Sequence, residues 1–157
     1  MKITLITVGK TTFPFVKEGI EVYLKRIKHY IAFDMVEIPE LKNVSSLTKE
    51  QIKSKEGELI LKQIKPTDKV ILLDEKGRDF SSVEWSKEIE KEMNMGTKNL
   101  IFTVGGSYGY SQDVYNRADS KLSLSKMTFS HQIIRLFFVE QLYRAFTIIK
   151  GEPYHNE

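Results

Sequence analysis

Residues 69–74 of the chain read Lys-Val-Ile-Leu-Leu-Asp, and every residue between the two charged ends is apolar. A half-exposed strand alternates apolar and polar side chains, whereas a strand covered on both faces is apolar throughout. The segment therefore predicts a central strand of a parallel sheet that has helices on both faces. Residues 75–78, Glu-Lys-Gly-Arg, follow and predict a turn.

The rest of the chain alternates between strand and helix patterns in the same way. Further strands are predicted over residues 3–8, 33–38, 99–104 and 121–125. Helices are predicted over residues 14–30, 48–64, 81–96, 112–117 and 131–149. This alternation predicts an α/β fold in which a mostly parallel sheet is flanked by helices, within a single domain that spans residues 1–157.

The composition excludes several classes of protein. The chain has 157 residues, 41% of them hydrophobic, and no cysteine, which excludes a disulfide framework, a zinc–thiolate site and a cysteine nucleophile. The apolar run within residues 1–10 is too short for a signal peptide, and no stretch approaches the ~18–20 apolar residues of a membrane span. We therefore expect a soluble cytoplasmic protein without a membrane partner.

The net charge of +3 is mild for a protein that binds nucleic acid. An RNA partner would therefore require positive charge that is local or pooled between subunits. One basic cluster is present, and a solvated helix face is its alternative interpretation. The cluster consists of Lys25, Arg26, Lys28 and His29.

The carboxyl ends of the predicted strands form the candidate site, because ligands of open parallel sheets bind there. These ends are Leu73-Asp74, Val104-Gly105 and Ser125-Lys126. Residues 105–109, Gly-Gly-Ser-Tyr-Gly, form either a ligand cradle or an ordinary strand-to-helix turn. This glycine loop matches neither the dinucleotide fingerprint nor a phosphate-binding loop, which disfavours a dinucleotide cofactor and nucleotide hydrolysis.

Two further segments carry polar side chains in unusual places. Residues 122–130 alternate hydroxyl and apolar side chains, and Ser125 and Thr128 either bind a ligand or cap the last helix. The tail, residues 154–157, contains a tyrosine, a histidine and a carboxylate. These residue types predict docking or chemistry, unless the end of the chain frays.

Arginines and histidines supply the remaining candidates. Arg135 and Arg144 on the last helix either hold phosphate or form a surface bridge with Glu140. No metal site is predicted, because the histidines are scattered and lack a carboxylate cluster at ligand spacing. They are His29, His131 and His155.

Three segments together resemble one family. They are residues 73–77, the glycine loop, and residues 122–155, which open with Leu-Ser-Leu-Ser-Lys-Met-Thr-Phe-Ser-His-Gln and close with Tyr-His. Together with the opening residues 1–10, they make the chain similar over essentially its full length to the ribosomal large subunit methyltransferase H family, of the SPOUT class.

The resemblance implies a SPOUT-type C-terminal trefoil knot, an obligate homodimer and S-adenosylmethionine as the cofactor. The implied reaction methylates N3 of a pseudouridine in helix 69 of 23S ribosomal RNA, within the assembled ribosome. By position, the implied cofactor contacts are Leu73, Gly105, Leu124, Ser125, Lys126, Met127, Thr128 and Phe129.

The candidate catalytic residues are different from these cofactor contacts. The N3 proton of the base must leave, and His155, acting across the dimer, is the first candidate for the general base, with His131 second. Arg144 and Arg135 are candidates for placing RNA phosphates or stabilising an enolate-like oxygen. Tyr154 is a candidate for stacking on a base.

The chain departs from the family at Ser130, where relatives commonly carry proline, and we expect the serine to loosen the start of the last helix. Tyr108 and Tyr110 also differ from the residues expected in the glycine loop, and their roles stay open.

Two other functions remain as alternatives: a related knotted methyltransferase that acts on transfer RNA, and a non-catalytic ribosome-binding factor.

Overall fold

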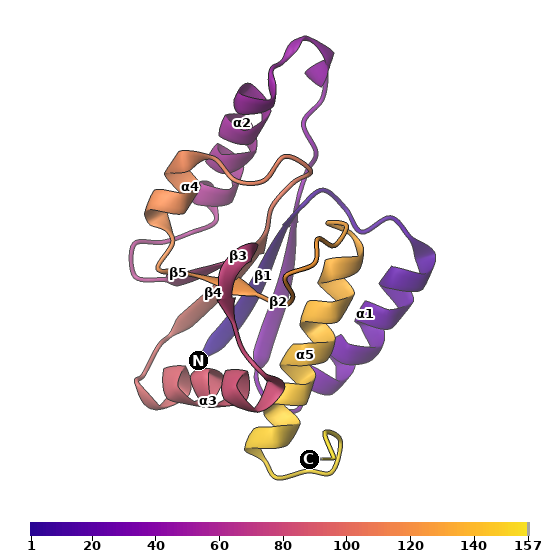
Figure 1. The fold of residues 1–157 in the computed structure, drawn as a ribbon, viewed down its shortest axis with the longest axis vertical. Helices are drawn as coiled ribbons and strands as arrows, with labels where there is room; N and C mark the ends of the chain where they lie inside the picture. Colours follow the sequence, from indigo (N-terminus) through magenta and orange to yellow (C-terminus); the bar gives the residue numbers. More distant parts are fainter. Residues whose placement is uncertain (157) are drawn as a thin grey trace.

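The computed structural model describes residues 1–156. Five parallel strands form one sheet in the order β2-β1-β4-β3-β5, and helices cover both of its faces (Figure 1). This arrangement confirms the predicted α/β class. The elements are β1 (Lys2–Val8), α1 (Pro14–Ile27), β2 (Ala32–Ile38), a short 3-10 helix (Val44–Ser46), α2 (Lys49–Lys62), β3 (Lys69–Asp79), α3 (Ser82–Asn94), β4 (Asn99–Val104), α4 (Gln112–Arg117), β5 (Ser120–Ser123) and α5 (Ile133–Ile149).

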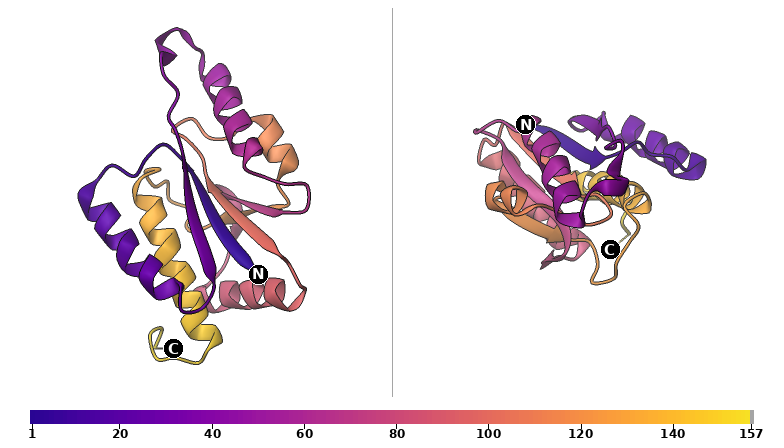
Figure 2. Two further views of the ribbon diagram at one scale, coloured as in Figure 1. Left: turned by 180° about the vertical axis from the view of Figure 1, so that it is seen from behind. Right: turned by 90° about the horizontal axis from the view of Figure 1, so that it is seen from above.

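Alternate residues of the central strands point to opposite faces of the sheet. Phe102 and Ile71 belong to the cluster formed with α1, α3 and α5, where Phe138 is fully buried. Ile101 and Leu72 belong to the opposite cluster, formed with α2 and α4. Figure 1 and the rear view in Figure 2 show α1 and α5 side by side on the first face. The apolar run at residues 69–74 is therefore covered on both sides, as its composition predicts.

The predicted helix starts are confirmed by their caps. Thr48 accepts a hydrogen bond from the backbone N–H of Gln51 at 3.1 Å, and Ser81 accepts one from Glu84 at 3.1 Å. The side chains of Gln51 and Glu84 in turn accept a hydrogen bond from the backbone N–H of their cap residue, which completes the two capping boxes. Pro14 occupies the first turn of α1, where its missing N–H has no cost.

Some element boundaries differ from the prediction. Tyr30 and Ile64 still pack against the two hydrophobic clusters although they lie past the helix ends. Apolar periodicity therefore continues beyond the last helical hydrogen bond. The corrected boundaries are the ends of α1 (Ile27, not Tyr30) and α2 (Lys62, not Ile64), the span of β5 (Ser120–Ser123, not 121–125) and the start of α5 (Ile133, not His131).

The turn predicted at residues 75–78 is wrong, because β3 continues to Asp79. The strand pairs with Leu122 of β5 at Leu73 and pairs with it again at Arg78, after an irregular stretch. Gly77 makes this possible, since a Cβ there would lie 2.7 Å from the backbone of Lys121. A charged, glycine-containing segment is typical of a turn, but here a strand far along the chain supplies the hydrogen-bonding partner.

Candidate active site

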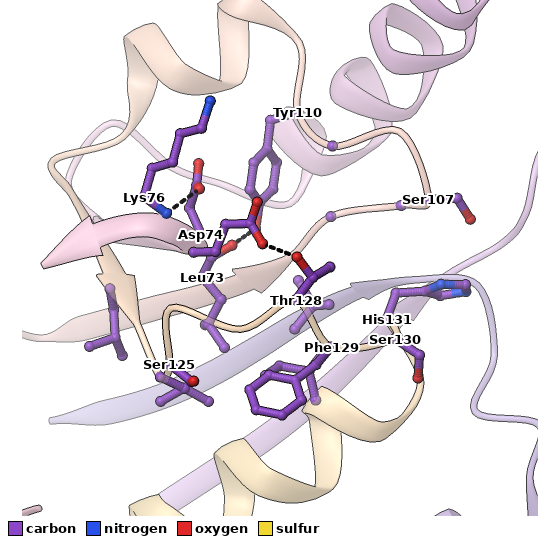
Figure 3. Close-up of a pocket in the computed structure, with 18 of the residues that line it drawn as sticks. Leu73, Asp74, Lys76, Ser107, Tyr110, Ser125, Thr128, Phe129, Ser130 and His131 are labelled. Carbon is purple, nitrogen blue, oxygen red and sulfur yellow. Dashed lines mark hydrogen bonds between the residues drawn. The ribbon is translucent and has the colours of Figure 1, made fainter. Parts of the chain in front are cut away.

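A cavity of 510 Å³ opens at the carboxyl ends of three neighbouring strands. Leu73 of β3 is in register with Val104 of β4 on one side and with Leu122 of β5 on the other. The strand ends expected to form the site therefore do meet, except that β5 ends at Ser123, two residues before the predicted position. Figure 3 shows Asp74, Tyr110 and Thr128 grouped around Leu73.

Most of the expected cofactor residues line this cavity. They come from β3, the glycine loop and the segment before α5, which are widely separated in sequence. Lys126 is exposed and is not among the lining residues. Those that line the cavity are Leu73, Gly105, Leu124, Ser125, Met127, Thr128 and Phe129.

Tyr110, whose role the sequence left open, ties two strand ends together beneath the cavity. Its hydroxyl lies 2.7 Å from the carbonyl oxygen of Thr103 and 3.1 Å from that of Leu73, and it accepts a hydrogen bond from the Thr103 hydroxyl at 3.0 Å. Burial of the ring raises the pKa of Tyr110 above its ordinary value. The phenol is therefore neutral, and it holds the ends of β3 and β4 in place.

Asp74 brings a carboxylate to the cavity wall. It accepts hydrogen bonds from the Tyr115 hydroxyl at 2.7 Å and from the backbone N–H of Lys76 at 2.9 Å. Burial and the bond to Asp74 raise the pKa of Tyr115 to about 12. Tyr115 could not be predicted as a site residue, because nothing in the sequence of the short α4 distinguishes this ring from an ordinary core residue.

The segment from Leu124 to Ser130 forms the other wall and belongs to no helix or strand. Ser125 accepts the N–H of Met127 at 3.1 Å, and the Thr128 hydroxyl donates to Glu75. Neither side chain caps α5, so the capping alternative for these two residues is wrong. Much of the segment's backbone is uncommitted to secondary structure, which leaves it available to a ligand.

The start of α5 is held by polar contacts. Ser130 accepts the N–H of Ile133 at 3.1 Å, a hydrogen bond that satisfies one backbone donor at the start of α5. His131 lines the cavity. Arg135 is fully buried and donates to the carbonyl oxygen of Val8 at 2.8 Å. The expectation that Arg135 contacts RNA phosphate is therefore wrong, because its guanidinium is enclosed between α5 and the end of β1.

The described part of the tail docks on the opposite end of α5. Arg144 donates to Glu140 at 2.6 Å and contacts the His155 Nδ1 at 3.1 Å. Tyr154 donates to Glu140 at 3.0 Å, and its ring packs edge-on against Tyr143. The tail is therefore not frayed. Ile134 of α5 lines the cavity and Arg144 lies ten residues further along the same helix, so at about 1.5 Å per residue Arg144 is about 15 Å from the cavity of its own chain.

The basic cluster at the end of α1 also lies away from the cavity. Its four side chains are exposed, and Arg26 sits 5.5 Å from the ring centre of Tyr143. This geometry favours the solvated-face interpretation of the cluster.

Comparison with known proteins shows the family of the chain. The family described as "Predicted SPOUT methyltransferase" matches residues 1–155 of the chain. The chain belongs to the SPOUT methyltransferase family. A relative from Christiangramia forsetii, named "Ribosomal RNA large subunit methyltransferase H", is 56% identical over 99% of both chains. Relatives of the same name from Bacteroides fragilis and Flavobacterium johnsoniae are 56% and 54% identical over the full length of both chains.

Within residues 1–156, no group of three or more histidine, cysteine, aspartate or glutamate side chains is arranged to hold a metal ion. Over the same residues, no helix is both long and apolar enough to cross a membrane.

Proposed function

We propose that this chain transfers the methyl group of S-adenosylmethionine to N3 of a pseudouridine in helix 69 of 23S ribosomal RNA, on the assembled ribosome in the cytoplasm. One observation carries the proposal. Seven residues expected to contact the cofactor, drawn from distant parts of the chain, line a single cavity. The names of the full-length relatives support the choice of large-subunit RNA as the substrate.

The cavity fits S-adenosylmethionine in size and chemistry. Its 510 Å³ lies within the range of small-molecule sites, about 300–1,000 Å³. Leu73, Leu124 and Phe129 offer apolar surface for an adenine ring, and Asp74 and Glu75 offer negative charge for cationic groups. When bound, S-adenosylmethionine supplies an electrophilic methyl group on a positively charged sulfur.

The proposal includes a trefoil knot at the carboxyl end of the chain. β5 lies at the edge of the sheet, yet α5 packs between α1 and α3. The connecting segment must therefore return across the ends of the inner strands, where Thr128 bonds to Glu75 of β3. A threaded connection is consistent with this path, although knots are rare.

The proposal also includes a homodimer in which one subunit completes the site of the other. The N3 proton must leave as the new bond forms, so a base must lie within hydrogen-bond reach. His131 lines the cavity of its own chain, whereas His155 is not among the lining residues and contacts Arg144 in the second half of α5. His155, Arg144 and Tyr154 therefore serve the reaction only if a second subunit brings them to the cavity.

Tritiated methyl transfer to purified ribosomes, with the product nucleoside identified by mass spectrometry, tests the reaction. Naked ribosomal RNA and transfer RNA serve as comparison substrates. We expect transfer to ribosomes that contain the pseudouridine and little to transfer RNA. Cofactor binding without transfer to any RNA would instead favour a non-catalytic factor.

Complementation tests the shared site. A chain that ends at Pro153 should lose transfer but keep its affinity for S-adenosylmethionine, measured by calorimetry. A second variant, Gly105→Val, should distort the cavity, since even a Cβ there would lie 3.2 Å from the ring of Tyr110, which lines it. Mixed dimers of the two variants should recover activity, because one intact cavity meets one intact tail. If the mixture stays inactive while each variant is folded, the tail does not act across the dimer.

A further inference from the structure

Two aromatic side chains at the start of α1 are exposed to solvent. Phe13 and Phe15 are 47% and 62% exposed, while Val16 beside them is fully buried. Their rings stack, with centroids 5.7 Å apart and planes inclined by 15°. The two rings, here called the aromatic pair, therefore present flat apolar faces at the protein surface and take no part in the core.

The aromatic pair is held at a defined position by the segment before it. The backbone N–H of Thr12 donates to the Gln132 Oε1 at 2.9 Å, and the Gln132 Nε2 donates to the carbonyl oxygen of Lys10 at 3.0 Å. Gln132 is itself buried. Pro14 restricts the backbone between the two rings. Little conformational freedom is therefore left to lose when a ligand contacts the pair.

The hydrogen bonds to Gln132 place the aromatic pair near the cavity. Gln132 directly follows His131, which lines the cavity. α1 begins just after the carboxyl end of β1 and α5 begins beside it, so the pair and the cavity share one edge of the sheet (Figure 1). A polymer whose target nucleotide enters the cavity has neighbouring nucleotides within reach of this edge.

Charge and size indicate what the aromatic pair binds. Lys10 and Lys17 flank it and are exposed, and the exposed Glu18 directly follows Lys17. Of the nearby carboxylates, Glu37 already accepts the N–H of Thr11 at 2.6 Å. The two stacked rings match a base in size and offer it a flat apolar face. Flat rings between cations are typical of sites that stack unpaired nucleic-acid bases.

We propose that the aromatic pair is a stacking site for an unpaired base of the RNA substrate, next to the nucleotide that is methylated. The inference rests on the proposed function, because it takes RNA as the substrate. The lysines on either side contact the phosphates that flank the stacked base. The pair thus contributes to binding of the RNA and not to the chemical step.

Steady-state kinetics with ribosomes tests this role. Phe15→Ala should raise the KM for ribosomes about tenfold, which corresponds to about 1.4 kcal/mol, within the range for loss of one stacked base. We expect kcat and the affinity for S-adenosylmethionine to stay within about twofold. Phe15→Trp should keep the KM near the wild-type value, while Phe15→Leu, which keeps apolar bulk but no ring, should resemble alanine. Met95→Ala is a matched control, because Met95 is 63% exposed at the other end of the sheet.

Several results would overturn the stacking site. One is an unchanged KM for ribosomes in a Phe13→Ala, Phe15→Ala double variant, and another is a wild-type KM in Phe15→Leu. A third is a lower molecular mass in solution for the double variant than for the wild type, which would show that the pair instead joins two copies of the chain. A binding assay separates this failure from failure of the proposed function. A single-stranded RNA oligonucleotide that carries 2-aminopurine should be quenched by the wild type and not by the double variant, whether or not ribosomes are methylated. Equal quenching by both proteins would also refute the site.

Discussion

Arg135→Met tests whether the buried guanidinium organises the site from within. Arg135 is fully buried, and its side chain joins the start of α5 to the carboxyl end of β1. Methionine has a similar length and no donors, so the substitution removes the hydrogen bonds while filling most of the space. The acceptors that would lose their donors are the carbonyl oxygens of Val8, Gly9 and His131 and the hydroxyl of Thr11.

The expected loss of stability follows from these contacts. The distances to the acceptors run from 2.8 to 3.0 Å, and Glu37 lies 3.6 Å from the guanidinium. Breaking a buried charged network by removing one partner costs roughly 3–5 kcal/mol. Because domains are stable by only about 5–15 kcal/mol, the variant should unfold roughly 10 °C below the wild type.

Urea denaturation and thermal unfolding at one fixed protein concentration measure the effect. Lys87→Met removes an equal charge from an exposed position on α3 and should change stability by no more than about 0.5 kcal/mol. Arg135→Lys should recover only part of the loss, since one ammonium does not reproduce the geometry of the guanidinium. A loss below about 1 kcal/mol in Arg135→Met, or a stable variant that only weakens ribosome binding, would refute the structural role.

Three further changes test other parts of the structure. Gly77→Ala should destabilise the protein by roughly 1–3 kcal/mol in urea unfolding, because its Cβ would lie 2.7 Å from the backbone of β5; wild-type stability would contradict the close approach. Tyr110→Phe should cost about 1–3 kcal/mol and weaken S-adenosylmethionine binding in calorimetry, because its hydroxyl holds the Leu73 carbonyl at 3.1 Å; unchanged stability and affinity would exclude that tie. Burial and Glu40 raise the pKa of Glu56, so its contribution to stability is present at low pH and lost as pH rises through the folded pKa. Glu56→Gln should therefore raise Tm near neutral pH but not well below pH 4.5, and an equal shift at both pH values would contradict this sign.

The sequence predicted most of the fold because the signals that mark its elements are local. A capping box involves residues three apart, and a buried strand shows itself in the apolar run at residues 69–74. The same reasoning located the cavity at the strand ends, since parallel strands present their carboxyl ends at one edge. The assignment of individual cofactor residues came from the family resemblance, not from periodicity.

Contacts between distant parts of the chain decided what the sequence left open. Arg135 and Arg144 look alike on one helix, yet Arg135 is buried because the end of β1, 126 residues away, encloses its guanidinium. β3 extends past residue 75 only because β5 lies beside it, and the position of the tail depends on Glu140 and Tyr143. Local patterns report the conformation of neighbouring residues, whereas burial and pairing depend on which surfaces meet when the chain folds.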